Sequence, residues 1–195
     1  MLEIRRKLVH AVGILTIFLI LWLGKWNAAI ITFLGAFMFV ILAEYRKNRD
    51  RYKIIKIKKL DEFEEFIENG LKEYERPNKL PFEGAIEFFA GCFFAIVLFE
   101  PRISMAAISV LSLADATSTL IGSYYGKHKL PINKNKTFEG STAFFLMSLF
   151  VLLFFLNPVK AFVVTIFATL AEMIPKIDDN LIIPLTVGIV MTIIS

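Results

Sequence analysis

Apolar runs separated by short polar segments dominate the pattern of this chain. The runs lie at 8–24, 27–43, 85–99, 103–126, 140–156, 159–174 and 181–195. Each run can form an α-helix, which satisfies its own backbone hydrogen bonds where water is absent. The pattern therefore predicts an all-α integral membrane protein, a bundle of about seven transmembrane helices in one domain over residues 1–195. Some runs have only 15 to 17 residues, so one or two could be re-entrant or tilted pieces.

The polar segment 44–84 between the second and third runs has its own periodicity. Apolar residues recur there at steps of three and four, the spacing of an amphipathic helix: Ile57, Leu60, Phe63, Phe66, Ile67, Leu71 and Tyr74. We expect a cytoplasmic amphipathic helix in this loop. It would lie on the inner leaflet or dock on the cytoplasmic face of the bundle, and the periodicity fits both arrangements.

Composition and charge agree with a membrane protein and orient it. Hydrophobic residues make up 56% of the chain, above the roughly 45–50% of soluble domains. With the N-terminus inside, 19 of the 22 Lys and Arg residues fall on the cytoplasmic side, as the positive-inside rule requires. The lone Cys92 excludes a disulfide framework. High Ile and Lys content indicates a prokaryotic source, and therefore a prokaryotic plasma membrane. The charge asymmetry places the N-terminus and the active site on the cytoplasmic side.

Asp115 is an ionisable residue inside an apolar run, where a charge costs about 2.5–3.5 kcal/mol on insertion scales. Small and polar residues share its helix face: Ser112, Ser118, Thr119 and Gly122. Such acids mark ion or substrate sites, although this one could merely fasten neighbouring helices through hydroxyl groups. The glycine pair at 122 and 126 is typical of close helix packing and has the wrong spacing for a phosphate loop.

The basic segment after this helix contains Lys127, Lys129, Lys134 and Lys136, a density that suits a polyphosphate or an anionic leaflet. Thr137 can cap the next helix, which places Glu139, Gly140 and Ser141 in its first turn. A helix start beside lysines is suited to phosphate, and ordinary capping is the alternative.

Further polar residues fall at the same predicted membrane face. Thr165, Thr169 and Glu172 form a second stripe, and Asp178, Asp179 and Asn180 follow it, as magnesium ligands or as a helix cap. Arg6, Lys7 and His10 precede the first run, as part of the site or as topogenic charges, and Glu87 lies near the start of the third run. Acids, lysines and helix starts at one end indicate phosphate chemistry on a nucleotide, with a lipid as the other substrate.

Three segments carry a family resemblance: "RRKLVHAVG", "LADATSTLIGSYYGKHKLP" joined to "NKTFEGS", and "ATLAEMIPKIDDNLIIP". Together they resemble the CTP-dependent polyprenol kinases, which include dolichol kinase, phytol kinase and the fungal CTP-dependent diacylglycerol kinase. The resemblance implies CTP as donor and shared polar positions at Asp115, Lys127, Lys136, Glu139, Gly140, Ser141, Glu172, Asp179 and Asn180. The chain departs from the family at Ala114, where a Gly is usual, and at Thr117 and Ser118.

The resulting hypothesis is a Mg²⁺-dependent kinase that transfers the γ-phosphate of CTP to a lipid alcohol, either an isoprenoid alcohol or diacylglycerol. Lys127, Lys129 and Lys136 would cradle the triphosphate with the helix start at 137–141. Asp115, with Glu172 or Asp179, would hold magnesium, and one carboxylate would accept the hydroxyl proton. Glu139 is a further candidate catalytic group.

Two rival functions fit parts of the same pattern. A cytidylyltransferase that makes a CDP-lipid also uses CTP, magnesium and a membrane lipid, but it releases pyrophosphate instead of CDP. A small transporter or channel would use Asp115 and Glu172 as a pathway, and should place functional polar groups at both faces. No nucleic-acid partner is expected, and the oligomeric state is left open.

Overall fold

The computed structural model describes residues 13–48, 80–175 and 178–195. Within these residues the chain is helical, apart from turns and one isolated antiparallel bridge between Lys129 and Thr137. The elements are α2 (Ile14–Leu23), α3 (Lys25–Lys47), α6 (Glu83–Leu98), α7 (Pro101–Ser109), the π-helical stretch η2 (Val110–Ala114), α8 (Asp115–Tyr125), α9 (Phe138–Leu152), α10 (Pro158–Glu172) and α11 (Asp179–Ile194). Each predicted apolar run overlaps one of these helices, with α7, η2 and α8 forming a continuous one.

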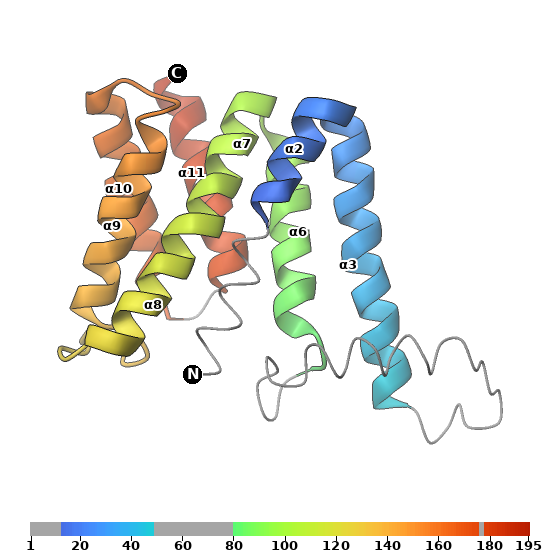
Figure 1. Ribbon diagram of the computed structural model, residues 1–195, viewed down its shortest axis with the longest axis horizontal. Coiled ribbons are helices and arrows are strands. Elements are labelled where there is room, and N and C mark those ends of the chain that lie inside the picture. Colours follow the sequence, from blue (N-terminus) through green and yellow to red (C-terminus); the bar gives the residue numbers. More distant parts are fainter. Residues whose placement is uncertain (1–12, 49–79, 176–177) are drawn as a thin grey trace.

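The helices run up and down beside one another, so successive helices lie in opposite directions (Figure 1). The end of α8, the start of α9 and the start of α11 therefore lie at the lower end of the molecule in this view, while the C-terminus lies at the upper end. This alternation brings together the polar segments that follow α8 and α10.

Local chemistry explains where several helices begin. Thr137 caps α9 by accepting a hydrogen bond from the Gly140 N–H at 3.1 Å. Asn157 caps α10 in the same way, with Pro158 at the first helical position, and Asp178 caps α11. The left-handed turn between α2 and α3 is made by Gly24, at φ 80°.

Two glycines allow α11 to approach its neighbours closely. A Cβ atom on Gly91 of α6 would lie 1.9 Å from the backbone oxygen of Asn180. A Cβ on Gly188 would lie 2.1 Å from the ring of Phe99. Side chains at these positions would push α11 away from α6. Gly91 therefore sets the approach at the start of α11, and Gly188 sets it in the second half of the helix.

The continuous helix α7–η2–α8 lies at the centre of the packing. Its buried residues pack with those of α9, α10 and α11 in one apolar cluster that includes Ile108, Leu111, Phe144, Val164 and Ile183. The π-helical stretch interrupts the regular hydrogen-bonding pattern immediately before Asp115. Such bulges are rare and often accompany functional sites.

The all-α prediction holds for the described residues, whereas the seven-span membrane bundle stays a prediction. Two described helices, Lys25–Lys47 and Pro101–Tyr125, are long and apolar enough to cross a membrane by length and composition. Large apolar side chains are exposed on the bundle surface, including Trp22, Phe154 and Ile193, and extensive exposed apolar surface indicates a membrane or a partner. Most of the predicted cytoplasmic loop, 49–79, lies outside the described residues.

Candidate functional site

Lys136 lies between two carboxylates that come from different helices. Its Nζ atom is 2.8 Å from Oε1 of Glu172, at the end of α10, and 2.9 Å from Oδ2 of Asp179, at the start of α11. The Glu172 side chain is fully buried and that of Lys136 is 19% exposed. The sequence predictions for these three residues therefore converge on one cluster.

Both carboxylate oxygens of Glu172 accept hydrogen bonds from hydroxyl groups. The Oγ of Ser118 on α8 donates to Oε1 at 3.0 Å, and the Oγ of Ser141 on α9 donates to Oε2 at 2.9 Å. With Lys136 also bonded to Oε1, three donors surround this side chain. Glu172 thereby joins α8, α9, α10 and the loop after α8.

Asp115 completes the cluster from the first residue of α8, directly after the π-helical stretch, with 1% of its surface exposed. It lies close enough to Lys136 to stabilise the ammonium charge. Burial lowers the pKa of Lys136, but Asp179, Glu172 and Asp115 outweigh that effect and hold the pKa above its ordinary value. Lys136 is therefore a cation at neutral pH that contacts two carboxylates and is further stabilised by the charge of Asp115.

The segment 126–137, which we call the lysine loop, directs only one of its lysines into this cluster. Buried Leu130 and Asn133 anchor the loop, and its ends are joined by the bridge between Lys129 and Thr137. The Lys127, Lys129 and Lys134 residues are exposed. Lys136 is thus the lysine that contacts the candidate site, and Lys127 and Lys129 are open to solvent at the same end.

The N–H groups at the start of α9 already donate hydrogen bonds within the protein. Phe138 N donates to the backbone oxygen of His128, and the N–H groups of Gly140 and Ser141 donate to the side chain and backbone oxygens of Thr137. This is the geometry of the capping alternative. A phosphate at this helix start would have to replace bonds that already exist.

Glu139, in the first turn of α9, binds His128 of the lysine loop. Its Oε1 lies 2.7 Å from Nδ1 of His128, and its Oε2 accepts a hydrogen bond from the His128 N–H at 3.3 Å. Backbone N–H groups, first that of Glu139 itself, together with His128 lower its pKa to about 2. The geometry gives Glu139 a role in holding the loop onto α9.

The start of α11 separates its two adjacent aspartates. Asp178 turns Oδ1 toward Asn180, accepting from its backbone N–H at 2.9 Å and from Nδ2 at 2.7 Å. This cap fixes the orientation of the Asn180 amide, because its Nδ2 must face the Asp178 carboxylate. The amide oxygen of Asn180 is buried and makes no hydrogen bond. Asp179 turns instead toward Lys136.

Two carboxylates of this cluster have the chemistry of magnesium ligands. Carboxylate oxygens are the ligands that Mg²⁺ prefers, and Asp115 and Asp179 both act on Lys136. Among the described residues, no three His, Cys, Asp or Glu side chains form a ready-made metal cage. Mg²⁺ in nucleotide sites uses one or two carboxylates and completes its shell with phosphate oxygens and water.

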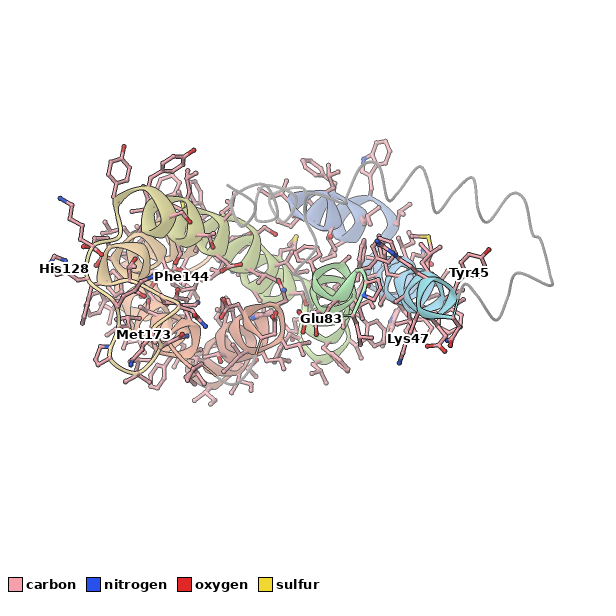
Figure 2. All side chains as sticks on the ribbon, turned by 90° about the horizontal axis from the view of Figure 1, so that it is seen from below. Tyr45, Lys47, Glu83, His128, Phe144 and Met173 are labelled. Atoms are coloured by element: carbon pink, nitrogen blue, oxygen red, sulfur yellow. The ribbon has the colours of Figure 1, made fainter. Side chains whose placement is uncertain are left out.

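The remaining predicted residues either lie outside the described part of the chain or belong to α6, beside the cluster that is described above. Arg6, Lys7 and His10 lie outside the described residues. Glu87 is one turn before Gly91 on α6, the helix that contacts the start of α11. Figure 2 views the end of the bundle that carries these groups; Met173, which follows Glu172, and His128 lie on one side of it, and Glu83 of α6 lies nearer the middle.

Sequence reasoning noted Ser118 on the stripe of Asp115 but did not include it among the site residues. Its position three residues after Asp115 was the available signal. Its partner, Glu172, is 54 residues away, and no local pattern indicates that pairing. His128, the partner of Glu139, was missed for a similar reason.

Comparison with known proteins identifies relatives among plant kinases. The chain is 27% identical over 141 residues to a probable phytol kinase 2, chloroplastic, of Glycine max, covering 62% of this chain and 48% of that protein. It is 27% identical over 135 residues to a probable phytol kinase, chloroplastic, of Zea mays, covering 59% and 44%. It is 36% identical over 101 residues to a farnesol kinase, chloroplastic, of Arabidopsis thaliana, covering 43% and 33%.

The chain spans about half the length of the first two of these curated relatives. No protein-family model matches it. No solved structure is significantly similar to it. The named relatives are chloroplast proteins of plants, so the expectation of a prokaryotic plasma membrane is not borne out. The resemblance predicted from the sequence is confirmed: this chain is homologous to kinases named for the isoprenoid alcohols phytol and farnesol.

Proposed function

We propose that this protein is a membrane lipid kinase that transfers the γ-phosphate of CTP to the hydroxyl of an isoprenoid alcohol, with Mg²⁺ as cofactor. The observation that carries the proposal is the contact of Lys136 with Glu172 and Asp179, beside buried Asp115. One ammonium among three carboxylates, at the end of a bundle with an apolar surface, suits phosphoryl transfer between a nucleotide and a lipid.

The donor nucleotide is assigned to the lysine loop. Lys136 provides a fixed positive charge for phosphate oxygens, and the exposed Lys127 and Lys129 extend that charge toward solvent. The start of α9 is a weaker phosphate site, since the N–H groups of Gly140 and Ser141 are already bonded to Thr137. The preference for CTP over ATP rests on the family resemblance.

The acceptor hydroxyl is assigned to Asp115. Its carboxylate accepts the hydroxyl proton while the alcohol oxygen attacks the γ-phosphorus. A new P–O bond forms to the lipid, the bond between the γ-phosphorus and the bridging oxygen breaks, and the nucleoside diphosphate leaves with the electron pair. Bound Mg²⁺ would neutralise phosphate charge, with Asp115 and Asp179 as its protein ligands.

The lipid class follows from the relatives and the surface. The relatives are named for phytol and farnesol, whose hydrophobic chains would remain in the bilayer while the hydroxyl reaches the polar end of the bundle. We place this end at the cytoplasmic face, because the predicted orientation puts 19 of 22 basic residues there. Farnesol and phytol are therefore the first acceptors to examine.

Product analysis tests the proposal. Purified protein in lipid nanodiscs is incubated with Mg²⁺, farnesol or phytol, and CTP labelled either at the γ-phosphate or in the base. A kinase moves the γ-label into lipid and produces labelled CDP. A parallel reaction offers a lipid phosphate, the acceptor that a CDP-lipid-forming cytidylyltransferase requires; pyrophosphate release with base label in the lipid would identify that enzyme instead. No labelled lipid with any alcohol would reject the kinase.

A further inference from the structure

We propose that Ser118 is a positioning residue: it holds Glu172 so that Glu172 holds the Lys136 ammonium in the place where it binds nucleotide phosphate. The inference rests on the proposed function and adds a residue to the site. Ser118 Oγ and Lys136 Nζ bond to the same atom, Oε1 of Glu172, at 3.0 and 2.8 Å. Ser141 holds the other oxygen at 2.9 Å.

The backbone around Ser118 leaves its hydroxyl little freedom to move. A Cβ on Gly140 would lie 3.0 Å from the backbone oxygen of Ser118 and 3.3 Å from the Cα of Gly122. Helices α8 and α9 are therefore in contact at this level, and the two serines approach Glu172 from fixed positions. Groups that are held in this way lose little entropy when they bind their partner.

The hydrogen-bond chemistry gives Glu172 a different role from Asp115. The Lys136 ammonium can only donate, and both serine hydroxyls donate in this geometry. Glu172 therefore accepts three bonds as a carboxylate, and taking up a proton would disrupt that arrangement. Glu172 is therefore suited to holding Lys136, and the proposed role of proton acceptor stays with Asp115.

Without the Ser118 hydroxyl, Oε1 of Glu172 would keep Lys136 as its donor but lose one of the two hydroxyl groups that hold the carboxylate in place. The ammonium could then shift toward Asp179, its other partner at 2.9 Å. Nucleotide phosphate would meet a displaced charge, whereas the lipid hydroxyl would meet an unchanged Asp115. The expected defect is therefore specific to the nucleotide.

The first experiment compares Ser118→Ala, Ser118→Cys and Thr117→Val in the full chain. The control, Thr117, has its hydroxyl bonded to the Leu113 backbone oxygen of its own helix. We expect Ser118→Ala and Ser118→Cys to raise KM for CTP about tenfold, the effect of losing a hydrogen bond to a charged group. KM for the alcohol should stay within about twofold, and Thr117→Val should change neither value. Equal changes in both KM values, or no change, would overturn the proposal.

A second measurement needs no turnover. Thermal midpoints are determined for Ser118→Ala, Ser141→Ala and the double variant. Because both hydroxyls hold one carboxylate, the double variant should lose less than the sum of the single losses. Additive losses would show that the serines do not share Glu172. Absence of lipid phosphorylation in the unmodified protein would reject the proposed function, while this cycle would still decide whether the two hydroxyls act together.

Discussion

The ammonium of Lys136 lies 2.8 Å from Glu172 and 2.9 Å from Asp179, and so joins the lysine loop to the end of α10 and the start of α11. These residues are far apart in the sequence, and Glu172 is fully buried. Removal of one partner from a buried ion pair leaves an uncompensated charge, which is strongly destabilising. The pair is therefore expected to support both stability and activity.

Lys136→Met separates these two contributions. Loss of the ammonium should lower the free energy of unfolding by about 3–5 kcal/mol and abolish phosphoryl transfer. The double variant Lys136→Met/Glu172→Gln removes the unpaired charge, so it should recover part of the stability and none of the activity. Lys134→Met, at an exposed position of the same loop, is the control. Full activity in Lys136→Met would remove this residue from the site.

Gly91→Ala examines the contact that places α11. The new Cβ would lie 1.9 Å from the backbone oxygen of Asn180, so the helices must separate. Overpacking of this kind costs about 1–3 kcal/mol, and activity should fall because Asp179 moves with the helix start. Gly35→Ala is the milder comparison, since its Cβ would lie 2.9 Å from the side chain of Phe89, whereas the Cβ at 91 would lie 1.9 Å from a backbone atom. Thermal unfolding and turnover that match the unmodified protein would show that the contact is not tight.

Thr137→Val examines the cap of α9. The valine has nearly the same shape but cannot accept the hydrogen bond from the Gly140 N–H. Loss of the cap should reduce the free energy of unfolding by about 1 kcal/mol. Thr142→Val, at an exposed position later in α9, is the control, because its hydroxyl bonds only to its own helix. Equal losses in the two variants would show that the cap contributes nothing specific.

The features that could be predicted from the sequence are local. Apolar runs locate the helices, because a helix satisfies the backbone hydrogen bonds of an apolar segment internally. Thr137 and Asp178 could be identified as caps from their neighbours. The cluster of Asp115, Glu172 and Asp179 could be anticipated only by placing polar residues at one membrane face.

The features that could not be predicted depend on packing between distant segments. Lys136 and Asp179 are 43 residues apart, and the choice of Lys136 among four lysines follows from how Leu130 and Asn133 anchor the loop. The π-helical stretch before Asp115 changes which side of the helix the following residues face. A prediction that assumes about 3.6 residues per turn throughout misses this change.

Glu139 gives a prediction for acid stability. It lies outside the predicted span at 140–156, and its pKa is lowered from 4.5 to about 2, first by its own backbone N–H and then by His128. A lowered folded-state pKa stabilises the protein above the unfolded value, and that contribution is lost as the pH falls through the folded value. The thermal midpoint should therefore fall between pH 4.5 and about 2 by more in the unmodified protein than in Glu139→Gln. Parallel curves would contradict this assignment.

The most direct test of the central claim is the rate of γ-phosphate transfer from CTP to farnesol or phytol by Asp115→Asn, which keeps the size of the side chain and removes its charge. Glu100→Gln is the control; this residue precedes α7, whose start lies at the upper end in Figure 1. The proposed mechanism predicts a loss of at least about 100-fold in Asp115→Asn, with Glu100→Gln fully active. Undiminished transfer in Asp115→Asn would contradict the assignment of this cluster as the active site.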